Sequence, residues 1–340
     1  MQKNTWPAAE WQQADAAVLN MNADILLKLD SVIQAEYENI TGIVVVRNGQ
    51  IAFENYYHGC GPSDAQHVAS VTKSVLSALI GIAIDRGFIQ SVDQKVLDFF
   101  PEYSPAGDEA QQREITLRHL LTMTVPYPFE DWREPLDQLC MQPDWIKYTL
   151  DGLGQNGRIG DFKYATRGAH LLSGILTRCT GMNARAFANQ YLFAPCGMRQ
   201  IPDYEMEAFG FDELFGSKLR GWVKDPQGNS TGGWGLTLTA RDMARFGLLY
   251  LNGGLWQDKR ILSQTWINES TQMNANHYGY LWWLREEGGF PLYMALGDGG
   301  NAIVCLPHQD LLVTITSAFK PDPRDRWTLI KEHILPAILD

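Results

Sequence analysis

Signals for β-strands occur near both ends of this chain, and the long middle part has a mostly helical pattern. Near the N-terminal end, residues 43–57 (IVVVRNGQIAFENYY) hold two β-rich runs joined at Asn48-Gly49, a pair that favours a tight hairpin. Near the C-terminal end, we expect strands over residues 278–284, 292–296, 302–306 and 311–317. Short connections between such strands require antiparallel pairing. The sequence therefore predicts one antiparallel sheet assembled from both ends of the chain.

Several helical patterns would flank this sheet. Residues 70–85 are apolar on most faces, which predicts a buried central helix. Thr166 precedes a helical pattern over residues 167–179 and is a plausible start signal for it. A last helix is expected over about residues 326–339, with a break at Pro336, because a proline ring does not fit inside a helix. Helices packed on an antiparallel sheet define an α+β fold.

The length and composition fit two interlocked lobes. The chain has 340 residues, of which 45% are hydrophobic and 20% are charged, as in folded globular proteins. We predict a discontinuous sheet lobe from residues 1–90 and 231–340, and a mostly helical inserted lobe from residues 91–230. The active site would then lie between the two lobes.

Charge and targeting signals exclude some classes of partner. The net charge of −11 makes nucleic acid and anionic membranes unfavourable partners. The first 20 residues lack the apolar core of a secretory signal, and the longest apolar stretch, residues 75–84, is too short to span a bilayer. Five widely separated cysteines without a C-x-x-C pair are typical of reduced thiols. We therefore expect a cytoplasmic protein that acts on a small molecule. We make no prediction of how many copies of the chain assemble.

No cofactor is expected. The seven histidines do not show the spacing of a zinc site, and neither a P-loop nor a dinucleotide-binding fingerprint is present. The chemistry would then rest on side chains and backbone groups alone.

Ser70 and Lys73 form the pattern S-x-x-K at the head of the predicted buried helix. Residues three apart share one face of a helix, so Ser Oγ and Lys Nζ can meet. Burial disfavours a charged ammonium and would let the lysine accept the serine proton. The alternative is that Ser70 is only the N-cap of this helix.

Two other serines compete with Ser70. Ser317-Ala318-Phe319-Lys320 repeats the S-x-x-K spacing, but it ends a predicted strand and runs into a proline. Residues 228–232 (GNSTG) satisfy G-x-S-x-G, an elbow that places a serine between a strand and a helix. The residues around Ser230 have loop composition on both sides, which favours a glycine-rich loop instead.

Several ordered stretches resemble one known superfamily. They are VASVTKSVLSALIGIAIDRGFI, EITLRHLLTMT, FKYATRGAHLLSGIL, YLFAPCGM and GGWGLTLTARDMARFGLLYLNGG, followed by the C-terminal strands. In these stretches, from about residue 40 onwards, the chain is similar to the serine β-lactamase-like superfamily. That superfamily includes class C β-lactamases, penicillin-binding D,D-peptidases, related carboxylesterases and 6-aminohexanoate-dimer hydrolases. The resemblance implies the β-lactamase/transpeptidase-like fold.

The resemblance also implies roles for individual residues. Ser70 would be acylated and Lys73 would assist it. Tyr164, in Tyr164-Ala165-Thr166, matches the Y-x-N/S element and would exchange protons with Ser70 and the leaving group. Thr166 departs from the usual Asn or Ser, so it is either a substrate contact or just the helix cap. A half-buried packing role is the alternative for Tyr164.

The third element of the superfamily, K-T-G or H-x-G on an inner strand, aligns with Asp298-Gly299-Gly300. The oxyanion hole would consist of the backbone N–H groups of Ser70 and Asn301, where such donors are worth ~3 kcal/mol each. A plain hairpin turn is the alternative. Trp234 is one of several aromatic residues expected at the cleft, and core packing is the alternative for them.

Asp298 bears on the substrate. β-Lactamases usually offer a cation at this element to hold the carboxylate of the drug, whereas this chain offers a carboxylate. Like charges in a partly dry cleft repel by about 1 kcal/mol or more. We therefore expect a serine hydrolase that cleaves small uncharged or amine-bearing esters or amides, with weak or no β-lactamase activity. The alternatives are a catalytically silent binding or sensor protein and a true class C-like β-lactamase.

Overall fold

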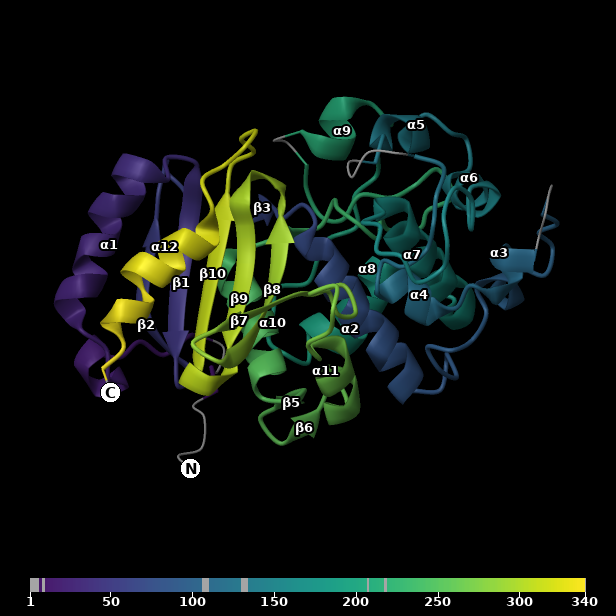
Figure 1. The fold of residues 1–340 in the computed structure, drawn as a ribbon. Helices are drawn as coiled ribbons and strands as arrows, with labels where there is room; N and C mark the ends of the chain where they lie inside the picture. The colour runs from purple at the N-terminus through teal and green to yellow at the C-terminus, as the bar shows by residue number, and fades with distance from the viewer. Residues whose placement is uncertain are drawn as a thin grey trace.

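A six-stranded antiparallel sheet forms the centre of the computed structural model, which describes residues 6–7, 10–105, 110–129, 134–206, 208–216 and 219–339 (Figure 1). The spatial order of its strands is β2-β1-β10-β9-β8-β7. Their bounds are β1 Ile40–Arg47, β2 Gln50–Tyr56, β7 Trp283–Glu287, β8 Phe290–Gly297, β9 Asn301–Leu306 and β10 Leu311–Ser317. Strands β1 and β10 pair along their whole length, so the predicted closure of one sheet by both chain ends is confirmed.

Residues with left-handed backbone conformations form the turns of two hairpins in the sheet. Asn48 and Gly49 have φ values of 51° and 77°, which matches the predicted tight turn between β1 and β2. The connection from β9 to β10 uses Asp310 at φ 46°, another conformation that short polar residues tolerate. These turns fix the register, because a slip by one residue would move every side chain to the opposite face.

Alternation along the strands separates two apolar layers. On one face, Val45 and Val313 pack under the helices α1 (Ala23–Glu36) and α12 (Arg326–His333). On the other face, Val44 and Leu312 join the larger core beneath α2 (Val71–Asp85) and α10 (Ala240–Leu251). Figure 1 shows α1 and α12 on the outer side of the sheet and α2 between the sheet and the helical part of the chain. The sheet thus supplies one wall of a site at α2.

The remaining helices are mostly short and gather beyond α2 (Figure 1). They are α3 Ala110–Glu114, α4 Leu117–Leu121, α5 Leu136–Cys140, α6 Trp145–Asp151, α7 Thr166–Thr180, α8 Ala184–Ala188 and α9 Phe211–Phe215, with α11 Gln264–Ser270 near the sheet. Short strand pairs also occur, β3 (Gln66–His67) with β4 (Thr237–Leu238) and β5 (Leu255–Trp256) with β6 (Lys259–Arg260). The α+β class with a mostly helical inserted part is confirmed, while the lobe boundaries at residues 90 and 230 stay a prediction.

Two details of the predicted elements are wrong. The strand expected over residues 278–284 begins only at Trp283, because His277 and Leu281 adopt left-handed φ values of 51° and 60° that interrupt an extended chain. Helix α7 starts at Thr166 itself, with Ala165 as its N-cap, so the Thr166 side chain does not cap the helix.

The break in the last helix is confirmed. Helix α12 ends at His333, and a short 3-10 turn over Leu335–Ala337 contains Pro336. Among the described residues, none of the helices combines the length and the apolar character needed to cross a bilayer.

Candidate active site

Ser70 stands at the first turn of α2, directly after a backbone distortion. Ala69 has a φ of 47°, which is uncommon for a residue with a side chain. Ser70 occupies the N-cap position of α2, but its hydroxyl accepts no hydrogen bond from the helix backbone. Ser70 therefore stands at the N-cap position, but its hydroxyl group does not cap the helix.

The partner of the Ser70 hydroxyl is Lys73. The Nζ atom of Lys73 lies 2.9 Å from Ser70 Oγ and donates a second hydrogen bond to the carbonyl oxygen of Gly233 at 3.0 Å. Lys73 is only 1% exposed, and within the described part of the chain no carboxylate forms an ion pair with it. The apolar side chains Val75 and Leu79, further along α2, are also fully buried. The structure thus brings the two predicted residues together, with the lysine buried and the serine partly exposed.

A glycine-rich loop delivers the carbonyl group that Lys73 uses. A Cβ atom at Gly233 would lie 2.3 Å from Thr166 Cγ2 and 3.3 Å from Lys73 Nζ, and one at Gly232 would lie 2.0 Å from the carbonyl oxygen of Ala169. Only glycine lets the backbone approach this closely. Gly233 is not among the predicted site residues, although the run Gly232-Gly233-Trp234-Gly235 is a signal for a close approach of the backbone.

Tyr164 lies over Lys73. The Nζ atom of Lys73 is 4.8 Å from the centroid of the Tyr164 ring. The ring stacks on Trp283 at 5.6 Å and meets Tyr278 edge-on at 6.0 Å, and Phe162 continues this aromatic wall. Tyr164 remains partly exposed, so it is accessible to a substrate, and proton exchange through its hydroxyl group stays a prediction.

The third element lies at the end of β8 and beside Ser70. A Cβ atom at Gly297 would stand 2.3 Å from the carbonyl oxygen of Val68 and 3.2 Å from the backbone nitrogen of Ser70. The next three residues, Asp298–Gly300, form a 3-10 turn between β8 and β9 instead of lying on an inner strand, and the Asp298 side chain is exposed. The predicted segment is therefore adjacent to Ser70, but its contact residue is Gly297, one position before the predicted motif.

Asn301 links this turn to the segment that carries Ser70. Its buried amide donates to the carbonyl oxygens of Asp298 at 2.9 Å and His67 at 3.3 Å, and its oxygen accepts from the Ser317 N–H at 3.0 Å. Asn301 also pairs with Gly297 across β8 and β9. The side chain thus holds the two segments together, and the role of its N–H in an oxyanion hole stays a prediction.

Two predicted substrate contacts have a different environment from the one expected. Trp234 is 3% exposed, stacks on Trp145 and Phe215, and donates its indole N–H to the carbonyl oxygen of Leu214 at 3.1 Å. Thr166 is 6% exposed, with its methyl group against Gly233. The Trp234 side chain is a core residue because the short α9 covers it. Core packing, the alternative given above, is correct for Trp234.

Both competing serines are engaged elsewhere. Ser317 ends β10 and donates its hydroxyl proton to the carbonyl oxygen of Gly300, while Lys320 pairs with the exposed Glu38. Ser230 is fully buried, and its Oγ accepts from the backbone N–H of Arg185 at 3.1 Å. Neither hydroxyl faces a base in the way that Ser70 faces Lys73.

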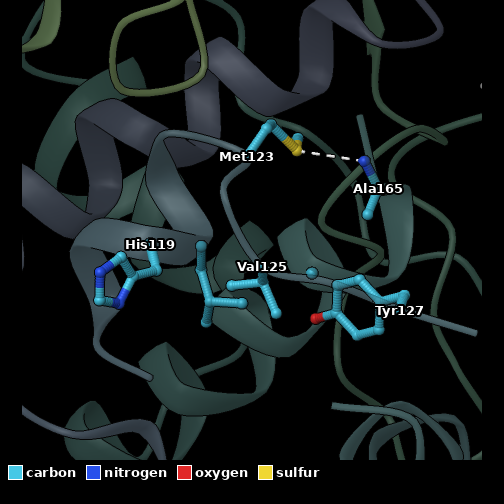
Figure 2. A pocket seen from close by; sticks show the side chains of 7 residues that line it. His119, Met123, Val125, Tyr127 and Ala165 are labelled. Carbon is cyan, nitrogen blue, oxygen red and sulfur yellow. Dashed lines mark hydrogen bonds between the residues drawn. The ribbon is translucent and has the colours of Figure 1, made fainter. Parts of the chain in front are cut away.

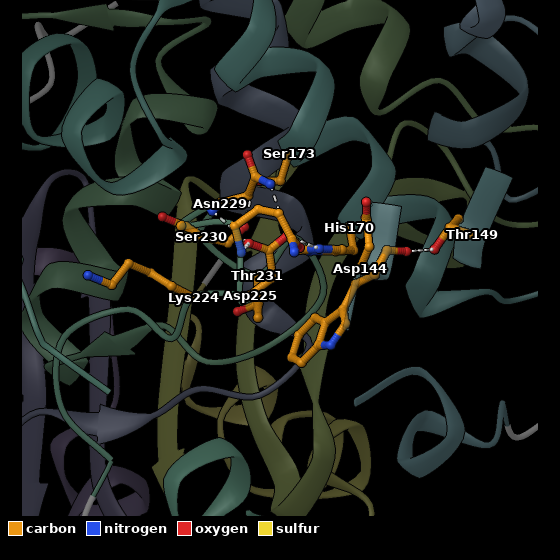
Figure 3. A network of polar contacts seen from close by, with 12 residues as sticks. Asp144, Thr149, His170, Ser173, Lys224, Asp225, Asn229, Ser230 and Thr231 are labelled. Carbon is orange, nitrogen blue, oxygen red and sulfur yellow. Dashed lines mark hydrogen bonds and ion pairs between the residues drawn. The ribbon is translucent and has the colours of Figure 1, made fainter. Parts of the chain in front are cut away.

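Ser230 belongs to a polar network beneath the glycine-rich loop (Figure 3). His170 on α7 lies 3.0 Å from the Asp225 carboxylate, and both side chains are fully buried. Asp225 accepts further hydrogen bonds from Asn229, while Ser173 donates to the Ser230 carbonyl oxygen at 2.6 Å. Burial alone would raise the pKa of Asp225, but these hydrogen bonds and the His170 side chain hold it below its usual value. The network anchors the loop that reaches Lys73.

A small apolar pocket lies at the start of α7, and Ser70 does not line it (Figure 2). In it, the backbone N–H of Ala165 points at the Met123 sulfur, 3.3 Å away. The pocket is lined by His119, Leu120, Met123, Val125, Tyr127, Ala165 and Gly168. It is part of the packing that seats the first turn of α7. No group of three or more potential metal ligands occurs among the residues described.

This sheet, with the serine helix packed on one face and a helical part inserted beyond it, defines the β-lactamase/transpeptidase-like fold. The chain belongs to the Beta-lactamase family, because the model of that family matches residues 29–334. The resemblance inferred from the sequence is therefore confirmed.

Several characterised or solved proteins are similar to this chain. It is 24% identical over 324 residues to the 6-aminohexanoate-dimer hydrolase of Paenarthrobacter ureafaciens, covering 86% of this chain and 76% of that protein. The octameric penicillin-binding protein homologue from Pyrococcus abyssi superposes with a TM-score of 0.70 at 19% identity, covering 92% of this chain and 77% of that one. EstCE1, described as a hydrolase with promiscuous acyltransferase activity, superposes with a TM-score of 0.70 at 16% identity, covering 96% of this chain and 99% of that one. The two structural likenesses show a shared fold.

Proposed function

We propose that this protein is a serine hydrolase that forms an acyl-enzyme at Ser70 and cleaves an ester or amide bond of a small molecule. The observation that carries the proposal is the 2.9 Å contact between Lys73 Nζ and Ser70 Oγ, in a buried setting beneath Tyr164. Hydrolases among the similar proteins support it.

The proposed reaction has two halves. With Lys73 as a neutral amine, the Ser70 hydroxyl transfers its proton to Nζ while Oγ attacks the substrate carbonyl carbon. The carbonyl π electrons move to oxygen, and backbone N–H groups of Ser70 and the Gly297–Asn301 segment stabilise the oxyanion. When the bond to the leaving group breaks, the proton passes through Tyr164 to that group. Water then attacks the acyl carbon, its proton passes along the same path to Ser70 Oγ, and the bond between the acyl carbon and Oγ breaks, which releases the acid and restores the Ser70 hydroxyl group.

The surroundings of Ser70 favour an uncharged or cationic substrate with an apolar group. The exposed carboxylate of Asp298 follows Gly297, which touches Ser70, so an anionic substrate meets a like charge there. The aromatic wall of Phe162, Tyr164 and Trp283 offers flat apolar surface beside the nucleophile. We therefore propose neutral esters and linear amides, with weak or no turnover of β-lactams.

The test is labelling with a fluorophosphonate probe, followed by mass spectrometry of the tryptic peptides. We expect one adduct on Ser70 in the wild type, no adduct in Ser70→Ala, and slow labelling in Lys73→Met. Ser230→Ala tests the competing serine and should keep its adduct on Ser70. Ser31→Ala, which changes an exposed serine of α1, is the matched control and should be labelled like the wild type. A panel of p-nitrophenyl esters, linear amides and nitrocefin, run with the same variants, assigns the substrate class.

The outcomes separate the alternatives. A folded wild type without any adduct would support the silent binding or sensor protein. Full hydrolysis by Ser70→Ala would move the chemistry to another serine, and efficient nitrocefin turnover would support a β-lactamase.

A further inference from the structure

Arg326 is a buried cation behind the turn that lies beside Ser70. It is 4% exposed at the first turn of α12, and within the described residues no carboxylate forms an ion pair with it. A cation is unfavourable at the N-terminal end of a helix, and burial adds a further cost. Burial lowers the pKa of Arg326 to about 10, so it remains charged at neutral pH. Its position must therefore be compensated by other contacts.

The compensating contacts include two carbonyl oxygens of the Asp298–Gly300 turn. Arg326 Nε donates to the carbonyl oxygen of Gly300 at 3.1 Å, and Nη2 donates to that of Gly299 at 3.3 Å. Nη2 also donates to Asn39 Oδ1 at 2.7 Å and to Ser317 Oγ at 3.2 Å. A guanidinium group presents several donors in a fixed plane, which suits such a set of acceptors.

Asn39 and Ser317 hold the same two carbonyl groups. Asn39 Nδ2 donates to the Gly299 carbonyl oxygen at 2.7 Å, and Ser317 Oγ donates to that of Gly300 at 3.2 Å. A Cβ atom at Gly300 would lie 2.6 Å from Arg326 Nε, so the fit also requires glycine at this position. Side chains before β1, at the end of β10 and in α12 thus converge on two consecutive peptide groups.

The two residues that flank the turn contact the segment that carries Ser70. Gly297, directly before the turn, lies against Val68 and the Ser70 backbone nitrogen, and Asn301, directly after it, bonds to His67. A shift of the turn would therefore move the backbone donors that face a substrate on Ser70. Displacement of such groups by 1 Å costs about 10²-fold in rate.

We infer that Arg326 is a positioning residue of the active site: its guanidinium group holds the Asp298–Gly300 turn by two carbonyl oxygens and so fixes where the turn meets Ser70. The inference rests on the proposed function for its effect on the rate. The holding of the turn itself is independent of any activity. Arg326 does not touch the substrate.

The test compares Arg326→Met and Arg326→Lys with Arg324→Met, a control that removes an exposed arginine two residues earlier on the same segment. Three properties are measured on the folded full chain: kcat and KM for a p-nitrophenyl ester, the rate of fluorophosphonate labelling at Ser70, and hydrogen exchange of the peptide covering residues 290–306. For Arg326→Met we expect kcat and labelling to fall about 10²-fold with KM within twofold, and exchange to accelerate in that peptide. Arg326→Lys should show a smaller change in the same direction, and Arg324→Met should match the wild type.

Unchanged kcat, labelling and exchange in folded Arg326→Met would overturn the inference. If Arg326→Met fails to fold, Arg326→Lys and Ser317→Ala decide, since each removes part of the same hydrogen-bond set. If the wild type neither labels at Ser70 nor cleaves esters, the proposed function fails, and hydrogen exchange alone decides whether Arg326 holds the turn. A loss of kcat that merely follows the fraction of unfolded protein would also contradict the inference.

Discussion

The carbonyl oxygen of Gly233 accepts a hydrogen bond from Lys73 Nζ at 3.0 Å, across 160 residues of sequence. This bond aims the amine, because Nζ then has one fixed partner on the loop and a second at Ser70 Oγ. The loop comes this close because residues 232 and 233 lack side chains. The position of the Lys73 amine therefore depends on backbone placement as much as on the lysine itself.

Replacing Gly233 by alanine should disable the site while leaving the fold in place. The new Cβ atom would lie 2.3 Å from Thr166 Cγ2, so the loop must move away from Lys73. We expect kcat for an ester to fall about 10²-fold, as for other misplaced catalytic groups. Steady-state kinetics, with circular dichroism to follow the fold, measure this. The control is Gly61→Ala, whose Cβ has room and should leave kcat unchanged. Equal kinetics in the two variants would contradict the role of the loop.

Replacing Tyr164 by phenylalanine should separate packing from proton transfer. The ring would keep its stacking on Trp283 and its place over Lys73, while the hydroxyl group is lost. We expect a fall in kcat of about 10²–10⁴-fold, the range for general acid–base groups, with little change in melting temperature. Tyr148→Phe, which removes a hydroxyl group whose hydrogen-bond partner is Gln138, serves as the control. Wild-type kcat in Tyr164→Phe would leave the tyrosine with the packing role only.

Neutralising Asp298 should change the preference for substrate charge. The exposed carboxylate repels an anionic substrate by about 1 kcal/mol, which corresponds to roughly a fivefold change. We expect Asp298→Asn to raise kcat/KM for nitrocefin by about that factor and to leave neutral esters unaffected. The effect should shrink in high salt, because salt screens exposed charges. Asp258→Asn, in the turn between β5 and β6, should change neither substrate. An equal change for charged and neutral substrates would show that Asp298 acts by other means.

His67 should make the protein sensitive to mild acid. Its Nε2 accepts a hydrogen bond from the Gly235 N–H at 3.0 Å, and burial lowers its pKa to about 4 from the ordinary 6.5. The unfolded chain therefore binds more protons than the folded chain between pH 6.5 and 4, so stability falls as the pH falls through this window. We expect a loss of about 1–3 kcal/mol, reduced by the partial exposure of the ring.

Denaturant unfolding from pH 7 to 4 measures this dependence. His67→Gln keeps a polar acceptor without a titrating ring, so its unfolding free energy should be flatter over the same range. His277→Gln, which replaces an exposed histidine, should retain the slope of the wild type. If His67→Gln is as sensitive to acid as the wild type, another group is responsible.

Local patterns in the sequence predicted the sheet, the buried serine helix and the S-x-x-K pair, because these depend on turn residues, alternation and a short spacing. Asn48-Gly49 requires its turn wherever it lies, and residues three apart on a helix meet in any context. The segment predicted from residues 298–300 lies beside Ser70, and the residue against the Ser70 backbone is Gly297, directly before it. The local sequence does not determine the residue at which β8 ends and the turn begins.

The sequence by itself determined the fold class and the family, and it predicted the Ser70–Lys73 pair that the structure brings together. The tertiary structure alone decided that Gly233 supplies the partner of Lys73, that Trp234 lies in the core, and that Arg326 holds the turn beside Ser70. Each of these contacts joins residues distant along the chain. They form only because the sheet closes from both ends, which brings the start of α2, the loop near residue 233 and the head of α12 around one point.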